Sequence, residues 1–219
     1  MAYVTTQNIK EKVPQWQKAI QAYNTHKMKL KLSKAALLVI DMQNFFLDPK
    51  SPTFVEGGLA IIPNVQKLIQ AFRLNNRPVI YTAHVHKSAE LDGGILAWWW
   101  QGICIEGTPE AKIHPDIAPL PEEKVIYKRR YSAFYNTELD VVLRCLKIED
   151  IVVSGIMTNI CCESTTRDAY FRDYRIFFIA DATGSVNEEL HLATLKNVAF
   201  GFAYVATIDE IMEQIRATC

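Results

Sequence analysis

The sequence predicts an α/β protein: a three-layer, doubly wound parallel sheet of about six strands with helices on both faces. Short runs that are apolar at nearly every position alternate with segments whose apolar residues recur at helical spacing. Strands of a parallel sheet covered on both faces have this uninterrupted apolar character. A length of 219 residues with 49% apolar content is sufficient for one continuous core.

Six segments have the pattern of strands, and the segments between them have the pattern of helices. The expected strands are 35–41, 78–84, 124–128, 150–155, 175–181 and 203–206. Strand, helix and strand in repetition imply right-handed crossovers between parallel strands. The expected helices are 61–72 and about 160–174, 187–200 and 208–217. A further helix is expected to begin at Asn136 or Thr137 as its N-cap and to bury its leucines up to Leu146.

Two stretches depart from this rhythm. Residues 1–34 precede the first strand and are expected to form a helical extension to a single domain over 35–219. Pro14 is expected in the first turn of a helix that carries Trp16, Ile20 and Tyr23 on one apolar stripe. That stripe covers either its own domain, which we favour, or a neighbouring subunit. Residues 85–123 are too long for an idle linker, so we expect them to shape a pocket.

Composition and charge exclude several classes of partner. Lysine plus arginine and aspartate plus glutamate both number 24, so no basic field is available for a nucleic-acid backbone. The longest apolar run, AALLVI, is far shorter than the roughly 20 residues that span a bilayer. The polar N-terminus lacks the apolar core of a secretory signal, and five cysteines without framework spacing suit a reducing compartment. We therefore expect a cytoplasmic protein with no nucleic-acid or membrane partner.

Three complementary ionisable groups follow strand ends, where ligands bind in open parallel sheets. Asp41 and Lys128 end strands, and Cys161 follows a third strand after a short turn. Each has an ordinary structural alternative: a turn cap, a solvated cation and a packed thiol. Together they suggest a thiolate nucleophile whose pKa is lowered by Lys128 and a helix start, with Asp41 as general base and acid.

The adjacent cysteines in ICC raise the question of which one reacts. Neighbouring residues on a helix point about 100° apart, so only one can face Lys128 squarely. With Asn159 as the helix N-cap, Cys161 lies among the free N–H groups of the first turn. The sequence therefore predicts Cys161 as the nucleophile and Cys162 as a core residue.

Three motifs resemble those of the isochorismatase-like cysteine hydrolase superfamily over about 35–210. They are LLVIDMQNFF, VIYKRRYSAF and VSGIMTNICCESTTRDA. The resemblance implies a catalytic triad of Asp41, Lys128 and Cys161. It also implies a non-proline cis peptide before Met157, with the N–H groups of Met157 and Cys161 as the oxyanion hole.

The resemblance further implies a substrate pocket and no resident metal or other cofactor. Phe45 stands where the first motif usually has an acid, so only Asn44 and Phe46 are carried over from that motif to the pocket. The nicotinamidase branch carries an Asp-x-His-x-x-His metal site, but TAHVHKSAE lacks that carboxylate and spacing. His84 and His86 leave a zinc site open as an alternative, but an H-x-H pair at a strand end more often orients loops or substrate, and His84 is assigned to the pocket. Tryptophans 98–100 form either a pocket wall or a subunit contact. We include Trp98, Trp99 and Trp100 among the pocket candidates.

The implied function is a cysteine amidohydrolase. It would cleave a C–N bond of a small carboxamide, carbamoyl or ureide substrate through an acyl-enzyme and release ammonia, in a dimer or tetramer of this chain. The connection HVHK…DGG…WWW resembles that of the N-carbamoylsarcosine amidase-like branch. Two alternatives remain open: a vinyl-ether hydrolase that uses Asp41 alone, and a catalytically silent binding or assembly protein.

Overall fold

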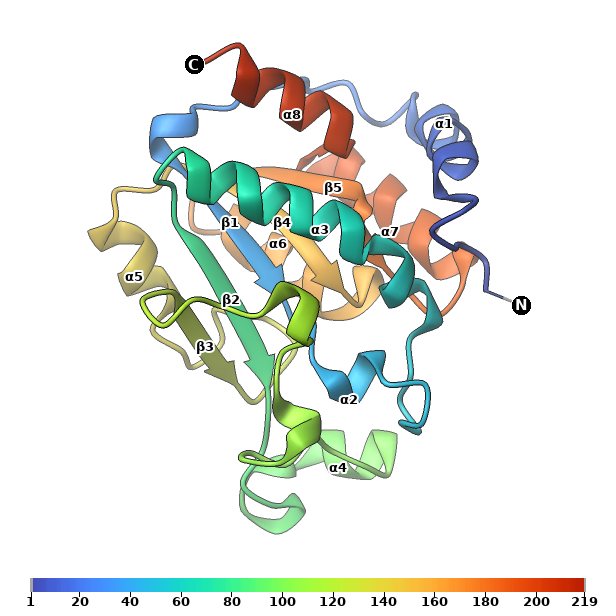
Figure 1. Cartoon of the computed structure of the whole chain (residues 1–219), viewed down its shortest axis with the longest axis vertical. Coiled ribbons are helices and arrows are strands. Elements are labelled where there is room, and N and C mark those ends of the chain that lie inside the picture. The colour runs from blue at the N-terminus through green and yellow to red at the C-terminus, as the bar shows by residue number, and fades with distance from the viewer. Residues whose placement is uncertain (1, 219) are drawn as a thin grey trace.

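A single six-stranded parallel sheet organises the molecule (Figure 1), and this confirms the predicted fold class. The computed structural model describes residues 2–218. The strand order is β3-β2-β1-β4-β5-β6, which reverses direction between β1 and β4. The strands are β1 (Ala35–Ile40), β2 (Val79–His84), β3 (Lys124–Lys128), β4 (Asp150–Ile156), β5 (Arg175–Gly184) and β6 (Tyr204–Ala206).

Helices cover both faces of the sheet and so bury the central strands. Every residue of β1, β2 and β4 is buried, as a strand covered on both faces requires. In Figure 1, α3 and α8 lie in front of the sheet, and α6 and α7 lie behind it. The longer helices are α1 (Ile9–Ile20), α3 (Glu56–Leu74), α5 (Leu139–Cys145), α6 (Glu163–Tyr170), α7 (Glu188–Gly201) and α8 (Ile208–Arg216).

The carboxyl ends of β1 and β2 point toward short helical segments that belong to the connections. Figure 1 shows α2 and α4 beyond those strand ends. The short segments are α2 (Asn44–Leu47), α4 (Ile95–Trp100), the 3₁₀ turns η1 (Leu32–Lys34), η3 (Pro109–Ala111) and η4 (Pro115–Ile117), and the π-helical turns η2 (Ala89–Gly93) and η5 (Thr158–Cys162).

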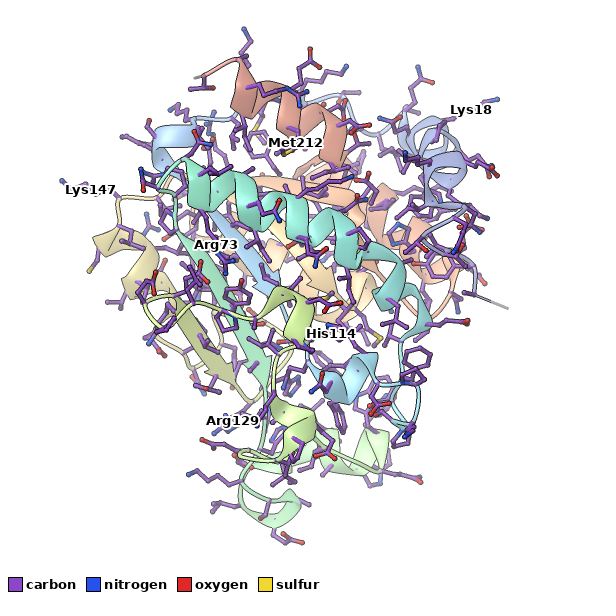
Figure 2. The ribbon with its side chains drawn as sticks, in the orientation of Figure 1. Lys18, Arg73, His114, Arg129, Lys147 and Met212 are labelled. Carbon is purple, nitrogen blue, oxygen red and sulfur yellow. The ribbon has the colours of Figure 1, made fainter. Side chains whose placement is uncertain are left out.

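The surface carries the charged residues, as the balanced composition leads one to expect. In Figure 2 the side chains of Lys18 and Lys147 point away from the body of the molecule, and Arg129 lies near the carboxyl end of β3. Within residues 2–218 no helix combines the length and the apolarity that crossing a membrane demands.

Two predicted helices differ from the structure. The helix expected over about 160–174 starts instead as the π-helical turn η5, and α6 ends at Tyr170. In α5 the expected burial of Leu146 is wrong, because its side chain is 46% exposed beyond the last turn. The Thr137 hydroxyl accepts a hydrogen bond from the Leu139 N–H, whereas Asn136 takes a left-handed backbone conformation before the helix.

The N-terminal helix packs on its own chain. α1 begins at Ile9, so Pro14 lies in its second turn, not in the first turn as predicted. Trp16 and Ile20 are buried, and α1 contacts α7 and β5. Tyr23 lies beyond the helix end and is exposed, so it does not continue the buried stripe. Of the two alternatives left open, the structure shows the stripe covering its own fold.

Candidate active site

The three predicted catalytic groups meet at the carboxyl edge of the sheet. Asp41 follows β1, Lys128 ends β3, and Cys161 lies in η5 after β4. The Lys128 ammonium lies 2.7 Å from Asp41 Oδ2 and 3.4 Å from Cys161 Sγ. All three side chains are buried. Because the strand order reverses between β1 and β4, Asp41 and Cys161 flank the switch point, where open α/β sheets bind ligands.

The two oxygens of the Asp41 carboxylate have different surroundings. Oδ1 accepts a hydrogen bond of 2.5 Å from the Thr82 hydroxyl, which also accepts one from the Asp41 backbone N–H. Oδ2 is in the ion pair with Lys128, and among the described residues no donor is aligned on it as a hydrogen bond. Oδ2 is therefore the oxygen that is free to take a proton from a neighbouring thiol.

Lys128 is held as a cation by acceptors on several sides. Its ammonium donates to the Arg130 carbonyl at 3.0 Å and contacts His84 Nδ1 at 3.4 Å. Burial is the largest single effect and lowers the pKa of Lys128, but the interactions with Asp41 and Cys161 together outweigh it and raise that pKa above its ordinary value. The side chain thus carries a fixed positive charge beside the thiol.

Two imidazoles continue from Lys128 toward the surface. His84 Nε2 lies 3.2 Å from His86 Nε2, and His86 Nδ1 lies 3.2 Å from the Asp92 carbonyl. Burial and the Lys128 charge lower the pKa of His84 well below its ordinary value, and burial lowers the pKa of His86. Neutral rings satisfy every contact when His84 carries its proton on Nε2 and His86 carries its proton on Nδ1.

The resting state of Cys161 differs from the expectation. We expected Lys128 and a helix start to lower its pKa, but burial raises the pKa of the thiol to about 12 despite the attraction of Lys128. Desolvation wins because the side chain is only 6% exposed. The group therefore rests as a thiol, and its attack requires removal of the proton by a base, for which Asp41 is in position.

The nucleophile turn begins at a cis peptide bond between Ile156 and Met157, as the resemblance implies. The Met157 carbonyl accepts hydrogen bonds from the N–H groups of Ile160 and Cys162. The expected N-cap role of Asn159 is wrong, because its side-chain oxygen accepts a hydrogen bond from the Ser185 hydroxyl instead. The oxyanion-hole role of the Met157 and Cys161 N–H groups stays a prediction.

Cys162 occupies the core beneath the turn. Its side chain is fully buried, and burial raises the pKa of its thiol well above the ordinary value. Cys161, in contrast, borders a cavity. Of the two adjacent cysteines, Cys161 is therefore the one that a small molecule can reach.

A cavity of about 230 Å³ opens over Cys161. Its walls come from the segment 45–55, the connection 100–104, the nucleophile turn, and the start of α7. Aromatic side chains dominate it, namely Phe45, Phe46, Phe54, Trp100 and Tyr131. A cavity of this kind suits a small, flat and largely apolar ligand.

The predicted pocket residues divide into two groups. Phe46, His84 and Trp100 border the cavity. Asn44, Trp98 and Trp99 do not: the Asn44 amide donates to the Pro109 carbonyl, and the two tryptophans are 69% and 63% exposed. These three lie outside this cavity because a short helix turns successive side chains to different sides, and their role in substrate binding stays a prediction.

Sequence reasoning did not assign several residues that belong to the site, and four of them show why. Phe45 borders the cavity although its departure from the motif set it aside, and Thr82, Cys104 and His86 were not assigned to the site. Thr82 lies two residues before the end of β2, which pairs with β1, and Asp41 directly follows β1, so strand register was the signal that pointed to Thr82. Cys104 and His86 lie in the long connection, which carries no periodic pattern.

The donor atoms near the ion pair do not suit a resident metal ion. One donor atom from each of Asp41, His84 and Cys161 lies within 4.8 Å of the others. The Lys128 ammonium contacts all three of these side chains, at 2.7 to 3.4 Å, so a cation already neutralises the cluster. His86, which carries the other imidazole, is engaged with His84 and Asp92. We therefore derive no chemical step through a metal.

Comparison with known proteins places this site in a family. The isochorismatase domain model matches residues 35–210. Nicotinamidase 3 of Arabidopsis thaliana is 40% identical over 197 residues, which is 88% of this chain and 94% of that protein. These findings show a hydrolase that acts on amide C–N bonds.

Solved structures agree with the sequence comparisons. A cysteine hydrolase from Pseudomonas syringae pv. phaseolicola superposes with a TM-score of 0.85 at 28% identity, over 88% of this chain and 97% of that chain. N-carbamoylsarcosine amidase from Thermoplasma acidophilum superposes with a TM-score of 0.71 at 28% identity, over 80% and 97%. The chain belongs to the isochorismatase family.

Proposed function

We propose that the protein is a cysteine amidohydrolase that converts a small, uncharged carboxamide to its acid and ammonia through an acyl-enzyme on Cys161. The observation that carries the proposal is the buried Lys128–Asp41 ion pair, 2.7 Å between charged atoms, with a cavity-facing thiol 3.4 Å from the same ammonium. A nucleophile, a base and a fixed cation are the parts that acyl transfer needs.

The chemistry of the first half-reaction follows from the resting thiol. Asp41 Oδ2 takes the Sγ proton as Cys161 Sγ bonds to the substrate carbonyl carbon, and the carbonyl oxygen becomes an oxyanion. We assign the N–H groups of Met157 and Cys161 to that oxyanion, as donors aimed at developing charge. Asp41 then returns the proton to the leaving nitrogen, the C–N bond breaks, and ammonia departs.

The second half-reaction repeats these roles with water. Asp41 removes a proton from a water molecule that attacks the thioester carbon, and the second oxyanion uses the same donors. Collapse breaks the C–S bond, the acid product leaves, and the proton returns to Sγ. Lys128, 2.7 Å from Asp41 Oδ2, holds that carboxyl group in place through both half-reactions.

The cavity supports a flat, uncharged substrate. None of its described lining residues is a lysine, arginine, aspartate or glutamate, and its two imidazoles, His84 and His86, have lowered pKa values that keep them neutral. A substrate carboxylate would lose its hydration there without gaining a partner. Nicotinamide has the size, planarity and neutrality that this cavity selects, and the 40% identity to a nicotinamidase points to the same molecule.

Ammonia release from a substrate panel tests the proposal. We expect turnover of nicotinamide, weaker turnover of carbamoyl compounds that carry a carboxylate, and no turnover by Cys161→Ala. Cys162→Ala is the matched control, since it removes the neighbouring thiol from the core but leaves the cavity intact, and we expect it to keep activity. Mass spectrometry of a rapidly quenched reaction is expected to find the acyl adduct on Cys161.

The results distinguish the alternatives. Full activity in Cys161→Ala with loss in Asp41→Asn would replace the proposal with an Asp41-dependent hydrolysis. Preferred turnover of the carboxylate-bearing carbamoyl compounds would assign the carbamoyl class instead. Inactivity of the native protein toward every compound would favour a binding or assembly role.

Three further expectations are kept as proposals. We propose that residues 1–34 are an extension to a hydrolase domain over 35–219, that the protein acts in the cytoplasm, and that it forms a homo-oligomer. The four described cysteines are all free thiols, which suits a reducing compartment. Exposed Trp98 and Trp99 offer apolar area for self-association. Sedimentation equilibrium tests the assembly, and a monomer at all concentrations would contradict it.

A further inference from the structure

Asn159 presents a free hydrogen-bond donor to the cavity. The residue precedes Ile160 and Cys161 in the nucleophile turn, and all three border the cavity. Its Oδ1 accepts a 2.6 Å hydrogen bond from the Ser185 hydroxyl. The contacts among the described residues include none for Asn159 Nδ2. The amide therefore has its acceptor end engaged and its donor end open.

The other polar side chains around the cavity already have partners. The Thr53 hydroxyl donates to the Phe45 carbonyl at 2.6 Å, and the Tyr131 hydroxyl accepts from Trp100 at 3.0 Å. The two imidazoles of the wall are paired with each other. Among the described residues, the Asn159 amide and the O–H of Tyr131, which only accepts in its bond with Trp100, are the polar side-chain donors left for a ligand. Of these two, Asn159 lies in the nucleophile turn, two residues before Cys161.

The N-terminal segment fixes the orientation of that amide. The Ser185 backbone N–H donates to Tyr3 Oη at 3.1 Å, while the Ser185 hydroxyl holds Asn159. Burial raises the pKa of Tyr3 to about 12, so its phenol stays neutral and accepts this hydrogen bond at physiological pH. Tyr3 lies outside residues 35–210, which the family model matches.

A second contact from the same segment reaches the neighbouring residue. His191 Nδ1 lies 2.9 Å from the Thr158 hydroxyl, and the His191 ring packs against Trp16 with ring centres 4.6 Å apart. The N-terminal segment runs alongside α7, which carries His191 (Figure 1). Two consecutive residues of the turn, 158 and 159, are therefore tied to the segment before the family domain.

We propose that Asn159 is a substrate-recognition residue that donates a hydrogen bond from Nδ2 to an acceptor on the substrate other than the scissile carbonyl. The class of ligand it selects is a heteroaromatic carboxamide with a ring nitrogen. Tyr3 and Ser185 are positioning residues for this contact. The proposal rests on the proposed function for its choice of ligands. A ligand without the acceptor leaves a donor unpaired in an apolar cavity, and this penalty produces the selectivity.

Binding of two isosteric amides tests the assignment without turnover. Nicotinamide and benzamide differ by one ring nitrogen, and titration calorimetry measures both against Cys161→Ala. We expect Cys161→Ala to bind nicotinamide about tenfold more tightly, the effect of one well-placed hydrogen bond. In Cys161→Ala/Asn159→Leu we expect the preference to be lost, because the affinity for nicotinamide falls about tenfold while the affinity for benzamide changes less than about twofold. Cys161→Ala/Asn159→Asp, which also removes the amide donor with little change of shape, is expected to lose the preference as well.

The positioning residues are tested in the same Cys161→Ala background. We expect Ser185→Ala and Tyr3→Phe to reduce the preference about three- to fivefold, since each removes one hydrogen bond that holds the amide. Tyr23→Phe is the matched control: Tyr23 lies on the same segment but is exposed, so the preference stays unchanged. Thermal unfolding of each variant shows that it is folded.

The outcomes separate this inference from the proposed function. Equal weakening of both amides in the Asn159 variants, no change in either, or no binding of either amide to Cys161→Ala overturns the recognition role. If the Asn159 variants lose the preference but the native enzyme releases no ammonia from nicotinamide, the recognition role is upheld and the proposed reaction is defeated. If Asn159→Leu turns over nicotinamide and prefers it to benzamide as strongly as the native enzyme does, only the recognition role is defeated.

Discussion

Lys128 and Asp41 form an ion pair that is removed from water on both sides. Their side chains are 0% and 1% exposed. Burying two charges costs several kcal/mol per ion, about as much as their attraction returns, so such a pair is poor evidence of a stability role. The reason to keep it is chemical. Lys128 holds the Asp41 carboxyl group beside a thiol that burial keeps protonated.

Breaking only one half of this pair is expected to destabilise the protein strongly. Lys128→Met leaves an unpaired buried carboxylate, and we expect a loss of about 3 to 5 kcal/mol in the free energy of unfolding. Asp41→Asn in the same chain removes the stranded charge, so the double variant recovers most of that loss. Urea unfolding at pH 7 measures all three proteins.

The matched control lies at the other end of the same strand. Lys124 pairs with Glu138 at 2.8 Å, but both side chains are about half exposed. Lys124→Met is therefore expected to cost less than about 1 kcal/mol. Purely additive losses for Lys128→Met and Asp41→Asn would show that the two side chains do not act as a pair.

At single residues the sequence predicts which groups meet but not what burial does to them. Asp41, Lys128 and Cys161 were identifiable because they follow strands whose carboxyl ends share one edge. The pKa direction of Cys161 was wrong because desolvation depends on side chains from the whole fold. Asn159 was expected as a helix cap for a related reason: its partner, Ser185, is 26 residues away in sequence.

Strands were predicted more accurately than helices. All six strands were found within a few residues of their observed bounds. In the covered strands β1, β2 and β4, burial on both faces gives a continuous apolar run with sharp ends, whereas the edge strand β3 is partly exposed. Helix starts were less accurate: Pro14 was placed in the first turn of α1, which begins five residues earlier, at Ile9. The π-helical turn η5 has no propensity signal, since its geometry is set by the strand before it and the helix after it.

Gly155 lies in β4 just before the nucleophile turn and is paired with Ile40 of β1. No other amino acid fits at this position. Its φ is +116°, and a Cβ atom would lie 2.1 Å from the Ile40 carbonyl oxygen. Since backbone fills that space, we expect Gly155→Ala to cost about 3 kcal/mol or more and to lower the yield of folded protein. Gly201→Ala is the control: a Cβ there meets nothing within 4 Å, and the residue ends a helix.

Chemical denaturation of the two glycine variants measures the effect. Gly201→Ala is expected to change stability by less than about 1 kcal/mol, and to raise it if anything, because alanine has the higher helix propensity. Equal stability of Gly155→Ala and the native protein would mean that β1 and β4 move apart without cost. That result would weaken the argument that the strands hold Asp41 and Cys161 rigidly.

At the scale of the whole molecule, the sequence predicts the architecture but not the cavity. The walls of the cavity come from separate segments spread between residues 45 and 190, and no local pattern joins them. The N-terminal helix was expected to cover either its own domain or a neighbour. Only the packed structure shows that it covers His191 and so reaches the nucleophile turn.

His191 makes the stability of the whole molecule depend on pH. Burial lowers its pKa from about 6.5 to about 3, so the ring stays neutral in the folded protein. Between these two values the unfolded chain binds a proton that the folded chain does not, and stability is lost as the pH falls from 6.5. The loss expected from this one residue is about 1.4 kcal/mol per pH unit, or between 2 and 3 kcal/mol at pH 4.5.

Asp181 opposes this effect, and the measurement has to separate the two groups. Burial raises the pKa of Asp181 to about 6, so its unfolded form releases a proton first and stability falls as the pH rises from about 4 to 6. The difference in unfolding free energy between the native protein and His191→Gln cancels the Asp181 contribution. We expect that difference to shrink steadily from pH 6.5 to 4.5, and His26→Gln, which replaces an exposed histidine, is the matched control. A difference that stays constant with pH would mean that the folded protein admits the proton, and that Trp16 and the N-terminal helix do not seal His191 from water.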